Sequence, residues 1–321
     1  MDNDQPVLAV SKLAVHFQGR GKAGPPVRAV DGVSFVIAPG ETLGLVGESG
    51  CGKSTIANAV VGLVPPTAGS VRIKGREVSG ASGSELRDIR RNVQLIFQDP
   101  NLSLNPRMSV GAAIGEPLLV RGIARGKQLS ERVAAILESV GLTPEHAARY
   151  PHQFSGGQRQ RVVIARGLAV QPALVVCDEP VSALDVSVRA QILNLLVDLQ
   201  RKLGIAYLFV SHDLSVVRHI CDRVAVMYLG CLVEVSDRET LFATPKHPYT
   251  RALMSSVLVP DPIVQRTSQR TILRGELPSP SNVPTGCAFH TRCPIATEIC
   301  RRVRPQLTPR PDSALVACHH A

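Results

Sequence analysis

The sequence contains no tryptophan, and aromatic residues amount to only 3% of the chain. None of them is interleaved with a run of basic residues, so a surface that stacks nucleic-acid bases is poorly supported. No uninterrupted apolar stretch approaches the roughly 20 residues that span a bilayer. The acidic, polar start at Met1–Pro6 lacks the basic and apolar regions of a signal peptide. We therefore expect neither a secreted nor an integral membrane protein, and the cytosol is the default location.

Charge, proline and cysteine are concentrated at one end of the chain. The 321 residues are 44% hydrophobic, enough for a sizeable core, and carry a net charge of +10. Lys246–Ala321 holds ten basic and four acidic residues, hence +6 of the +10, with ten of the 24 prolines and four of the eight cysteines. This shift predicts a boundary near Thr244–His247, between a domain over residues 1–245 and an extension over residues 246–321. The charge favours an anionic partner, such as nucleic acid, nucleotide or lipid headgroup.

Apolar runs alternate with helical patterns before that boundary. The runs typical of strands are Val7–Phe17, Val27–Ile37, Thr42–Val46, Val93–Phe97, Ala173–Cys177, Tyr207–Val210 and Val224–Tyr228. The helical patterns extend from Lys53 to about Leu63 and over Ser130–Val140, Gln160–Ala169 and Ser187–Leu203. This alternation predicts an α/β fold with a mainly parallel sheet.

A glycine-rich loop follows the strand predicted at Thr42–Val46. Gly47–Ser54 matches G-x-x-x-x-G-K-[ST] at every position, between a predicted strand and a predicted helix. Glycines let backbone N–H groups approach phosphates, and the helix N-terminus adds positive potential. Lys53 is expected to reach the β- and γ-phosphates, and Ser54 to bind Mg²⁺. The motif predicts a nucleoside triphosphate site formed by Gly47, Glu48, Ser49, Gly50, Cys51, Gly52, Lys53, Ser54 and Thr55.

Two consecutive acids end the apolar run Ala173–Cys177. Ligands of open α/β sheets bind at the carboxyl ends of the strands. Asp178 is therefore placed to hold Mg²⁺, and Glu179 to orient or deprotonate an attacking water. Two acids at a strand end are often merely solvated, but their combination with Lys53 favours a functional role.

A second phosphate-binding element precedes a predicted helix. Ser155, Gly156, Gly157 and Gln158 open that helix, and such an N-terminus attracts anions. One nucleotide uses only one phosphate loop. The second element therefore suggests an interface at which two chains share two nucleotides.

Six elements follow one another in a fixed order: Gly47–Thr55, Gln98, Ser155–Gln158, Asp178–Glu179, Ser182–Asp185 and Ser211–Asp213. Together they resemble the nucleotide-binding subunit of ATP-binding-cassette (ABC) transporters over residues 7–245. The resemblance implies an ABC-type nucleotide-binding domain with a parallel sheet core, an antiparallel β subdomain at the N-terminus and a helical subdomain around Asn101–Ala169. It also implies that ATP and Mg²⁺ are the cofactors.

The same resemblance implies roles for individual residues. Gln98 would contact Mg²⁺ and the attacking water and link the site to membrane subunits. Ser155, Gly156 and Gly157 would close over the γ-phosphate held by the opposite subunit, and Asp185 would lie in the loop that crosses the dimer. His212 would contact the γ-phosphate. Because Glu179 and His212 are both present, we expect an active ATPase.

The sequence differs from the usual pattern of the family at two positions. Phe154 stands where the family often has leucine, and Cys51 lies inside the phosphate loop, but neither replaces a catalytic group. Phe17 is the aromatic residue most suited to stack on adenine, with a place in the core as the alternative. The irregular stretch Gly19–Pro26 follows it.

Longer runs resemble the oligopeptide/dipeptide importer class, and its F-type ATPase subunit in particular. They include Phe97–Pro100, Ser103–Arg107, Asp185–Gln191, Ser211–Val217 and Pro245–Thr250. The resemblance implies that ATP hydrolysis by this chain powers peptide import, with nickel and glutathione as alternative cargoes in related members. It implies two permease subunits, a second ATPase subunit that is identical or paralogous, and indirectly an extracytoplasmic substrate-binding protein. The expected location is peripheral, on the cytoplasmic face of the cell membrane.

The main competing hypothesis is a nucleic-acid ATPase with the same type of head. Such heads need a long coiled-coil insertion, whereas only 102 positions separate Lys53 from Ser155 and no sustained heptads occur there. A translation-associated factor usually has two cassettes, and this chain has one. We therefore expect no nucleic-acid partner.

The extension holds cysteines at positions 287, 293, 300 and 318. Four thiolates can complete a tetrahedral zinc site or hold a four-iron cluster, and a segment short of core benefits from a metal. Within the importer class, a similar pattern is associated with a [4Fe–4S] cluster. An iron–sulfur cluster, zinc or another metal, and no metal at all remain the alternatives for Cys287, Cys293, Cys300 and Cys318. The cysteines at positions 51, 177, 221 and 231 are scattered and are interpreted as structural.

Overall fold

The computed structural model describes residues 5–19, 25–256, 273 and 275–321. The stretch from residue 20 to 24, within the irregular loop expected after Phe17, lies outside the described residues. The chain divides into two compact units, which we describe in turn. Unit 1 comprises Met1–Leu8, Ile37–Glu41 and Arg72–Leu208. Unit 2 comprises Ala9–Val36, Thr42–Val71 and Phe209–Ala321.

Unit 1 contains short parallel strands and most of the long helices. Its strands follow the order β8-β7-β6, and the end of β4 forms a small antiparallel ladder with β5. The strands are β5 (Arg76–Glu77), β6 (Val93–Ile96), β7 (Leu174–Asp178) and β8 (Ala206–Ser211), of which β8 continues into unit 2. The helices are α2 (Gly83–Asn92), α3 (Pro100–Ser103), α4 (Val110–Val120), α5 (Gly126–Ser139), α6 (Gly156–Leu168) and α7 (Val186–Leu203), with 3₁₀ turns η1 (Pro144–Ala148) and η2 (Pro151–Gln153).

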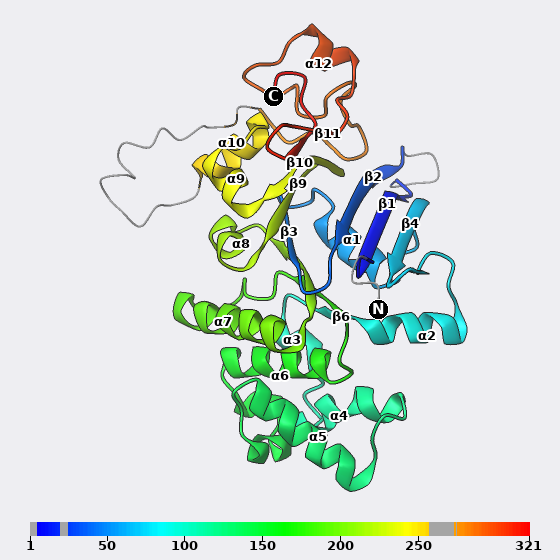
Figure 1. Cartoon of the computed structure of the whole chain (residues 1–321), viewed down its shortest axis with the longest axis vertical. Coiled ribbons are helices and arrows are strands. Elements are labelled where there is room, and N and C mark those ends of the chain that lie inside the picture. The colour runs from blue at the N-terminus through cyan, green and yellow to red at the C-terminus, as the bar shows by residue number, and fades with distance from the viewer. Residues whose placement is uncertain (1–4, 20–24, 257–272, 274) are drawn as a thin grey trace. The chain divides into compact units, whose positions relative to one another are not determined.

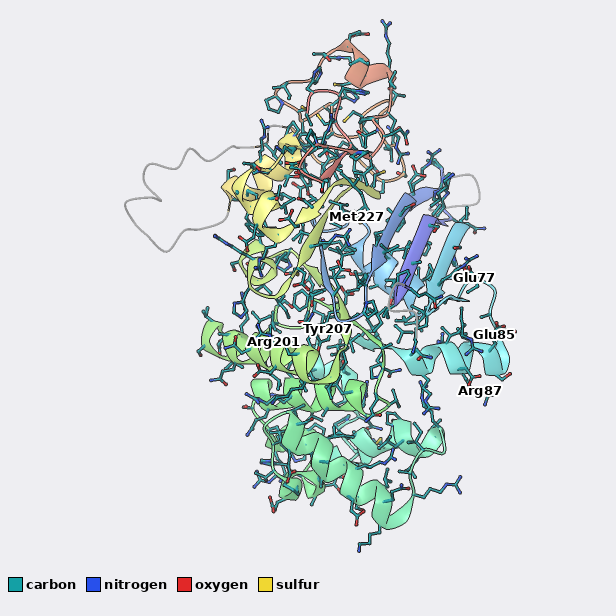
Figure 2. The ribbon with its side chains drawn as sticks, viewed as in Figure 1. Glu77, Glu85, Arg87, Arg201, Tyr207 and Met227 are labelled. Carbon is teal, nitrogen blue, oxygen red and sulfur yellow. The ribbon has the colours of Figure 1, made fainter. Side chains whose placement is uncertain are left out.

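The strands of unit 1 form its buried centre. β6 pairs with β7 in parallel, from Val93 opposite Leu174 to Ile96 opposite Cys177. Tyr207 in β8 is fully buried, and its hydroxyl donates a hydrogen bond to the Leu196 carbonyl oxygen of α7 over 3.2 Å. By contrast, Glu85 and Arg87 on α2 are exposed and point away from the fold (Figure 2). The parallel pairing of β6 with β7 thus places the carboxyl ends of both strands at one edge of the sheet.

A helical subdomain covers α3 to α6, as expected for the stretch around Asn101–Ala169. Helices α4, α5 and α6 lie against one another in unit 1 (Figure 1). The consecutive residues Val162, Val163 and Ile164 of α6 are all buried, so this helix is covered around much of its circumference. Packing of these apolar residues orients the N-terminus of α6, where Ser155 lies.

Unit 2 contains two sheets. The first is antiparallel in the order β2-β1-β4, and the second has the order β11-β12-β10-β9-β3. The strands are β1 (Leu8–Phe17), β2 (Val27–Ile37), β3 (Thr42–Val46), β4 (Ala68–Ile73), β9 (Arg223–Tyr228), β10 (Cys231–Asp237), β11 (Thr308–Pro309) and β12 (Leu315–Val316). The described helices are α1 (Lys53–Val60), α8 (Leu214–Ile220), α9 (Arg238–Ala243), α10 (Pro248–Ser255) and α12 (Glu298–Arg302).

The end of the chain adds strands to the second sheet of unit 2. Strand β3 pairs with β9 in parallel, β9 with β10 in antiparallel orientation, and β10 with β12 through Glu234 opposite Val316. We call residues 275–321 the C-terminal segment. It lies beside α10 and β10 (Figure 1). Its Phe289 is 1% exposed, so it has a place in the core of unit 2.

Among the residues that the structure describes, no helix combines the length and the apolar character that crossing a bilayer requires.

Candidate functional site

The glycine-rich loop of unit 2 connects a buried strand to a helix. All five residues of β3 are buried, and α1 begins at Lys53, as the motif predicts. The Cys51 N–H donates a hydrogen bond to the Glu48 carbonyl oxygen over 3.3 Å, and Gly230 donates to the Cys51 carbonyl oxygen over 2.9 Å. The loop is therefore held by its own backbone and by the turn between β9 and β10.

Two loop glycines have no room for a side chain. Gly47 has φ +156° and Gly52 has φ +108°. A Cβ on Gly47 would lie 2.2 Å from the Met227 carbonyl oxygen, and one on Gly52 would lie 2.1 Å from that of Ala29. Met227 belongs to β9 (Figure 2). The spacing of glycines in the motif thus matches a loop that lies directly against neighbouring backbone, as a phosphate-binding loop requires.

Lys53 lies inside the curve of the loop. Its Nζ donates hydrogen bonds to the carbonyl oxygens of Gly47 over 2.8 Å and Glu48 over 3.0 Å, and the residue is 5% exposed. Cys51 Sγ lies 3.8 Å from the same Nζ. Burial raises the pKa of the Cys51 thiol, although Lys53 opposes this rise. The raised pKa favours the protonated thiol of Cys51 beside Lys53.

Two residues far along the chain bind the loop, and the sequence analysis did not identify either as functional. The Glu48 N–H donates a hydrogen bond to Tyr249 Oη over 2.9 Å, and the Glu48 carboxylate pairs with Arg292 over 2.9 Å. Tyr249 belongs to the run Pro245–Thr250, which resembles the importer class. This resemblance was the one sign in the sequence that Tyr249 has a functional role. Nothing in the sequence pairs Arg292 with the loop.

In unit 1, Gln98 and Glu179 meet at the edge of the sheet. Gln98 follows β6 by two residues, and Glu179 directly follows β7. Because the two strands are parallel neighbours, their ends meet at one edge. Gln98 Nε2 donates a hydrogen bond to Glu179 Oε2 over 3.1 Å. The structure thus brings together the amide and the carboxylate for which the resemblance implies roles at the attacking water.

The backbone of Glu179 adopts an unusual conformation. Its φ is +49°, in the left-handed region that costs a non-glycine residue on the order of 1 kcal/mol. Its carbonyl oxygen accepts hydrogen bonds from the Ser182 hydroxyl over 3.0 Å and the Ser182 N–H over 3.3 Å. The turn after β7 therefore fixes the direction of the Glu179 side chain. Asp178, the last residue of β7, is half-buried.

The second phosphate-binding element caps α6 in unit 1. Ser155 Oγ accepts a hydrogen bond from the Gln158 N–H over 3.3 Å, and Gln158 Oε1 accepts one from the Ser155 N–H over 3.0 Å. This reciprocal pair is a capping box, which fixes the first helical turn. Gly156 and Gly157 form that turn, and Asp185 lies exposed at the start of α7.

The remaining predicted residues occupy loops and strand ends. Phe17 ends β1 in unit 2 and is 44% exposed, so it is not a core residue. His212 follows β8, is exposed, and precedes Asp213, which caps α8. Ser49 is exposed on the loop, whereas Ser54 is exposed and Thr55 half-buried in the first turn of α1. The roles proposed for these side chains stay predictions.

The four cysteines of the C-terminal segment do not form the expected metal site. Burial raises the pKa of Cys287 to about 11, and Cys300, Cys293 and Cys318 add to the rise. Over the described ranges, however, no three His, Cys, Asp or Glu side chains are arranged to hold a metal ion. Cys300 Sγ instead contacts Thr297 Oγ1 over 3.6 Å, and Cys318 Sγ accepts from the His320 N–H over 3.4 Å. The prediction of an iron–sulfur cluster or zinc is not supported, and no chemistry is assigned to either.

Comparison with protein families gives two matches. Residues 30–182 match the model of "ABC transporter", and residues 233–300 match that of "Oligopeptide/dipeptide transporter, C-terminal region". The first match includes the phosphate loop, Gln98 and Glu179. The second includes Tyr249 and Arg292.

Similar proteins cover nearly the whole chain. The oligopeptide transport ATP-binding protein AppF of Bacillus subtilis is 51% identical, with 99% of this chain and 98% of that protein covered. The di/tripeptide transport ATP-binding protein DppF of Pseudomonas aeruginosa is 50% identical, with 98% of each covered. The oligopeptide transport ATP-binding protein OppF of Escherichia coli is 52% identical, with 94% of this chain and 92% of that protein covered.

Solved structures show the same fold. The ATP-binding cassette MJ0796, in a dimeric post-hydrolysis state bound to ADP and Pi, has a TM-score of 0.64 and 30% identity, and the match covers 72% of this chain and 98% of that chain. The protein cbiO1 from Clostridium perfringens, part of an ABC transporter complex, has a TM-score of 0.66 and 26% identity, with 75% and 92% covered. The predicted fold class is therefore confirmed.

Proposed function

Because the chain belongs to the ATP-binding subunits of the ABC transporter family, we propose that it powers the import of dipeptides or oligopeptides across the cytoplasmic membrane. It is an ATPase by family membership. One observation carries the assignment to peptides: the oligopeptide/dipeptide family model matches residues 233–300, beyond the cassette itself. Three relatives named for oligopeptide or di/tripeptide transport share about half of their residues with it.

ATP binding is assigned to the phosphate loop. Its backbone N–H groups and the N-terminus of α1 would face the phosphates, with Lys53 Nζ exchanging carbonyl partners for phosphate oxygens. Phe17 would stack on adenine, for which its 44% exposure leaves it available. The exposed position of His212 after β8 suits a contact with the γ-phosphate.

Mg²⁺ is the expected metal at this site. The family resemblance assigns Mg²⁺ to three residues. The Ser54 hydroxyl in unit 2 and, separately in unit 1, the Asp178 carboxylate and the Gln98 amide offer the oxygen donors that Mg²⁺ prefers. When bound, the ion neutralises charge on the phosphates during transfer.

Hydrolysis is assigned to Glu179. Its carboxylate is held by Gln98 Nε2 and by the constrained turn after β7, which suits it to accept a proton from an attacking water. Gln98 would orient the carboxylate and the same water. Such preorganisation lowers the cost of reaching the reactive geometry.

A second cassette is part of the proposal. The capped N-terminus formed by Ser155–Gln158 is an anion-binding element in addition to the phosphate loop. It would close over the γ-phosphate held by the other cassette, and Asp185 would lie in the loop between them. The partner cassette is either an identical chain or a paralogue.

Membrane subunits are the remaining partners. Close to Gln98 in the sequence, Leu102 is 88% exposed and Phe97 is 43% exposed, which provides an apolar surface for two permease subunits at the cytoplasmic face of the membrane. Cargo would reach the permeases from an extracytoplasmic substrate-binding protein, so this chain would not contact it.

Copurification from solubilised membranes tests the partners. A tagged full-length chain is expected to recover two permease subunits and a second cassette, identified by mass spectrometry. The test variant is Leu102→Asp, which should recover less permease than the unsubstituted chain does. It should still fold, because Leu102 is almost fully exposed. Recovery of nucleic acid in place of permeases would contradict the proposal.

A further inference from the structure

The second residue of the phosphate loop is tied to the C-terminal segment by its side chain as well as its backbone. Arg292 Nη1 donates to Glu48 Oε2 over 2.9 Å, and Nη2 donates to Glu48 Oε1 over 3.2 Å. The Glu48 N–H donates to Tyr249 Oη over 2.9 Å. The Arg292 side chain is 9% exposed and that of Glu48 is 27% exposed. This pair is therefore bidentate and largely shielded, unlike an ordinary surface ion pair.

Arg292 rests on an aromatic cluster inside unit 2. Its guanidinium lies 6.0 Å from the centre of the Tyr228 ring. Tyr228, Tyr249 and Phe289 pack with ring centroids 4.7 to 5.5 Å apart, and all three are essentially buried. The Arg292 N–H also donates to the Phe289 carbonyl oxygen over 3.0 Å. The cluster joins β9, α10 and the C-terminal segment, so Arg292 has a defined place under the loop.

The position of Glu48 gives this contact a consequence for nucleotide binding. A carboxylate inside a phosphate-binding loop repels the phosphate charges unless a cation neutralises it. The backbone N–H of Glu48 donates a hydrogen bond to Tyr249 Oη, and this contact fixes the orientation of the loop at Glu48. Lys53, the cation within the loop, is needed to bind the phosphates, so the charge of Glu48 has to be neutralised by Arg292.

We propose that Arg292 is a positioning residue for nucleotide binding, which neutralises and orients Glu48 and so makes the phosphate loop depend on the folded C-terminal segment. This inference rests on the proposed function, since it assumes that the loop binds ATP. It assigns to the C-terminal segment a direct effect on the nucleotide site of its own chain.

The test is calorimetric titration of the full-length chain with a non-hydrolysable ATP analogue and Mg²⁺. Arg292→Met is expected to weaken binding by about 10-fold, a common size for coupling between linked sites. Arg292→Lys, which keeps the charge but not the bidentate geometry, should weaken it less. The matched control is Arg302→Gln, which removes an exposed arginine paired with Glu298 in the same segment and should bind as the unsubstituted chain does.

A second substitution separates charge from folding. Glu48→Gln removes the repulsion, so the double variant Glu48→Gln/Arg292→Met should bind the analogue more tightly than Arg292→Met alone. A purely structural role of Arg292 would give no such rescue. If Arg292→Met does not fold, as judged by circular dichroism, Arg292→Lys with and without Glu48→Gln gives the same comparison.

Two results would overturn the inference. They are unchanged binding by Arg292→Met and the absence of rescue in the double variant. Failure of the unsubstituted chain to bind the analogue would instead contradict the proposed function, so the two failures are distinguishable.

Discussion

Gln98 and Glu179 are joined by a hydrogen bond from Nε2 to Oε2 over 3.1 Å, although 81 positions separate them in the chain. The parallel pairing of β6 with β7 produces this contact, because it places the residues after both strands at one edge. The carboxylate that would activate water is therefore oriented by a side chain of the neighbouring strand's end.

Replacement of Glu179 tests its role as general base. Glu179→Gln should lower the rate of ATP hydrolysis at this site by about 100-fold or more, while ATP still binds, because the amide cannot accept the proton of water. Phosphate release and retention of labelled ATP measure the two effects. The matched control is Glu138→Gln on the exposed face of α5, which should hydrolyse ATP normally. Full turnover by Glu179→Gln would remove Glu179 from the mechanism.

Replacement of Gln98 tests the orientation of that base. Gln98→Leu removes the hydrogen bond to Glu179 and should lower kcat by about 10-fold with little change in KM for ATP, since the bond affects chemistry more than binding. Steady-state ATPase kinetics separate the two constants. An increase in KM with unchanged kcat would show that Gln98 acts in binding alone.

The tight packing of Gly157 provides a test in unit 1. A Cβ at this position would lie 2.4 Å from Val188 Cγ1 of α7. Gly157→Ala should therefore destabilise the protein by about 1–3 kcal/mol, the usual cost of overpacking. Adding Val188→Ala should recover most of this loss, which thermal or denaturant unfolding measures. A double variant as unstable as Gly157→Ala would show that the helix N-terminus requires glycine for another reason.

The burial of His247 leads us to expect that the free energy of unfolding depends on pH. Its Nδ1 accepts a hydrogen bond from the Tyr249 N–H over 3.1 Å and so caps α10, while Glu234 accepts from the His247 N–H over 2.9 Å. Burial, with help from the charge of Arg251, lowers the pKa of His247 to about 4. The folded state thus favours the neutral ring. Its contribution is present above pH 6.5, the usual pKa of histidine, and is lost as the pH falls from there towards 4.

The full effect is about 3 kcal/mol, because the pKa falls from 6.5 to about 4, and on the order of 2 kcal/mol of it is lost between pH 7.5 and pH 5. Denaturant unfolding at pH 7.5 and pH 5 measures it. His247→Asn is the matched control, because asparagine also caps helices but does not titrate between these values. The difference in stability between the two pH values should be smaller in this variant. Equal pH dependence in both proteins would contradict the assignment to His247.

Local features of the sequence predicted much of the fold. Thr42–Val46 is a strand with the predicted bounds, and α1 starts at the predicted Lys53 but ends at Val60 instead of Leu63. Helix α2 was not predicted, since only Ile89 of its ten residues is buried and charged residues dominate its sequence. Helix α4 was not predicted either, and it contains Pro117, a residue that normally ends a helix.

The contacts between distant residues were beyond a single sequence. Arg292 and Glu48 lie 244 positions apart, and nothing in the local pattern of either residue specifies the other. The four cysteines of the C-terminal segment led to a prediction of a shared metal that the structure does not support. Their spacing along the chain does not fix the directions in which the thiols point. Motifs that act through backbone geometry, such as the phosphate loop, were the most predictable parts.

The most direct test of the central claim is uptake of a labelled dipeptide into proteoliposomes. They would contain this chain, its permeases and partner cassette, with ATP on the side of the cassettes and the substrate-binding protein on the other. We predict uptake that requires ATP and is strongly reduced by Glu179→Gln, with no comparable uptake of nickel or glutathione. Transport of nickel or glutathione in place of peptide, or peptide uptake that does not depend on ATP, would contradict this account.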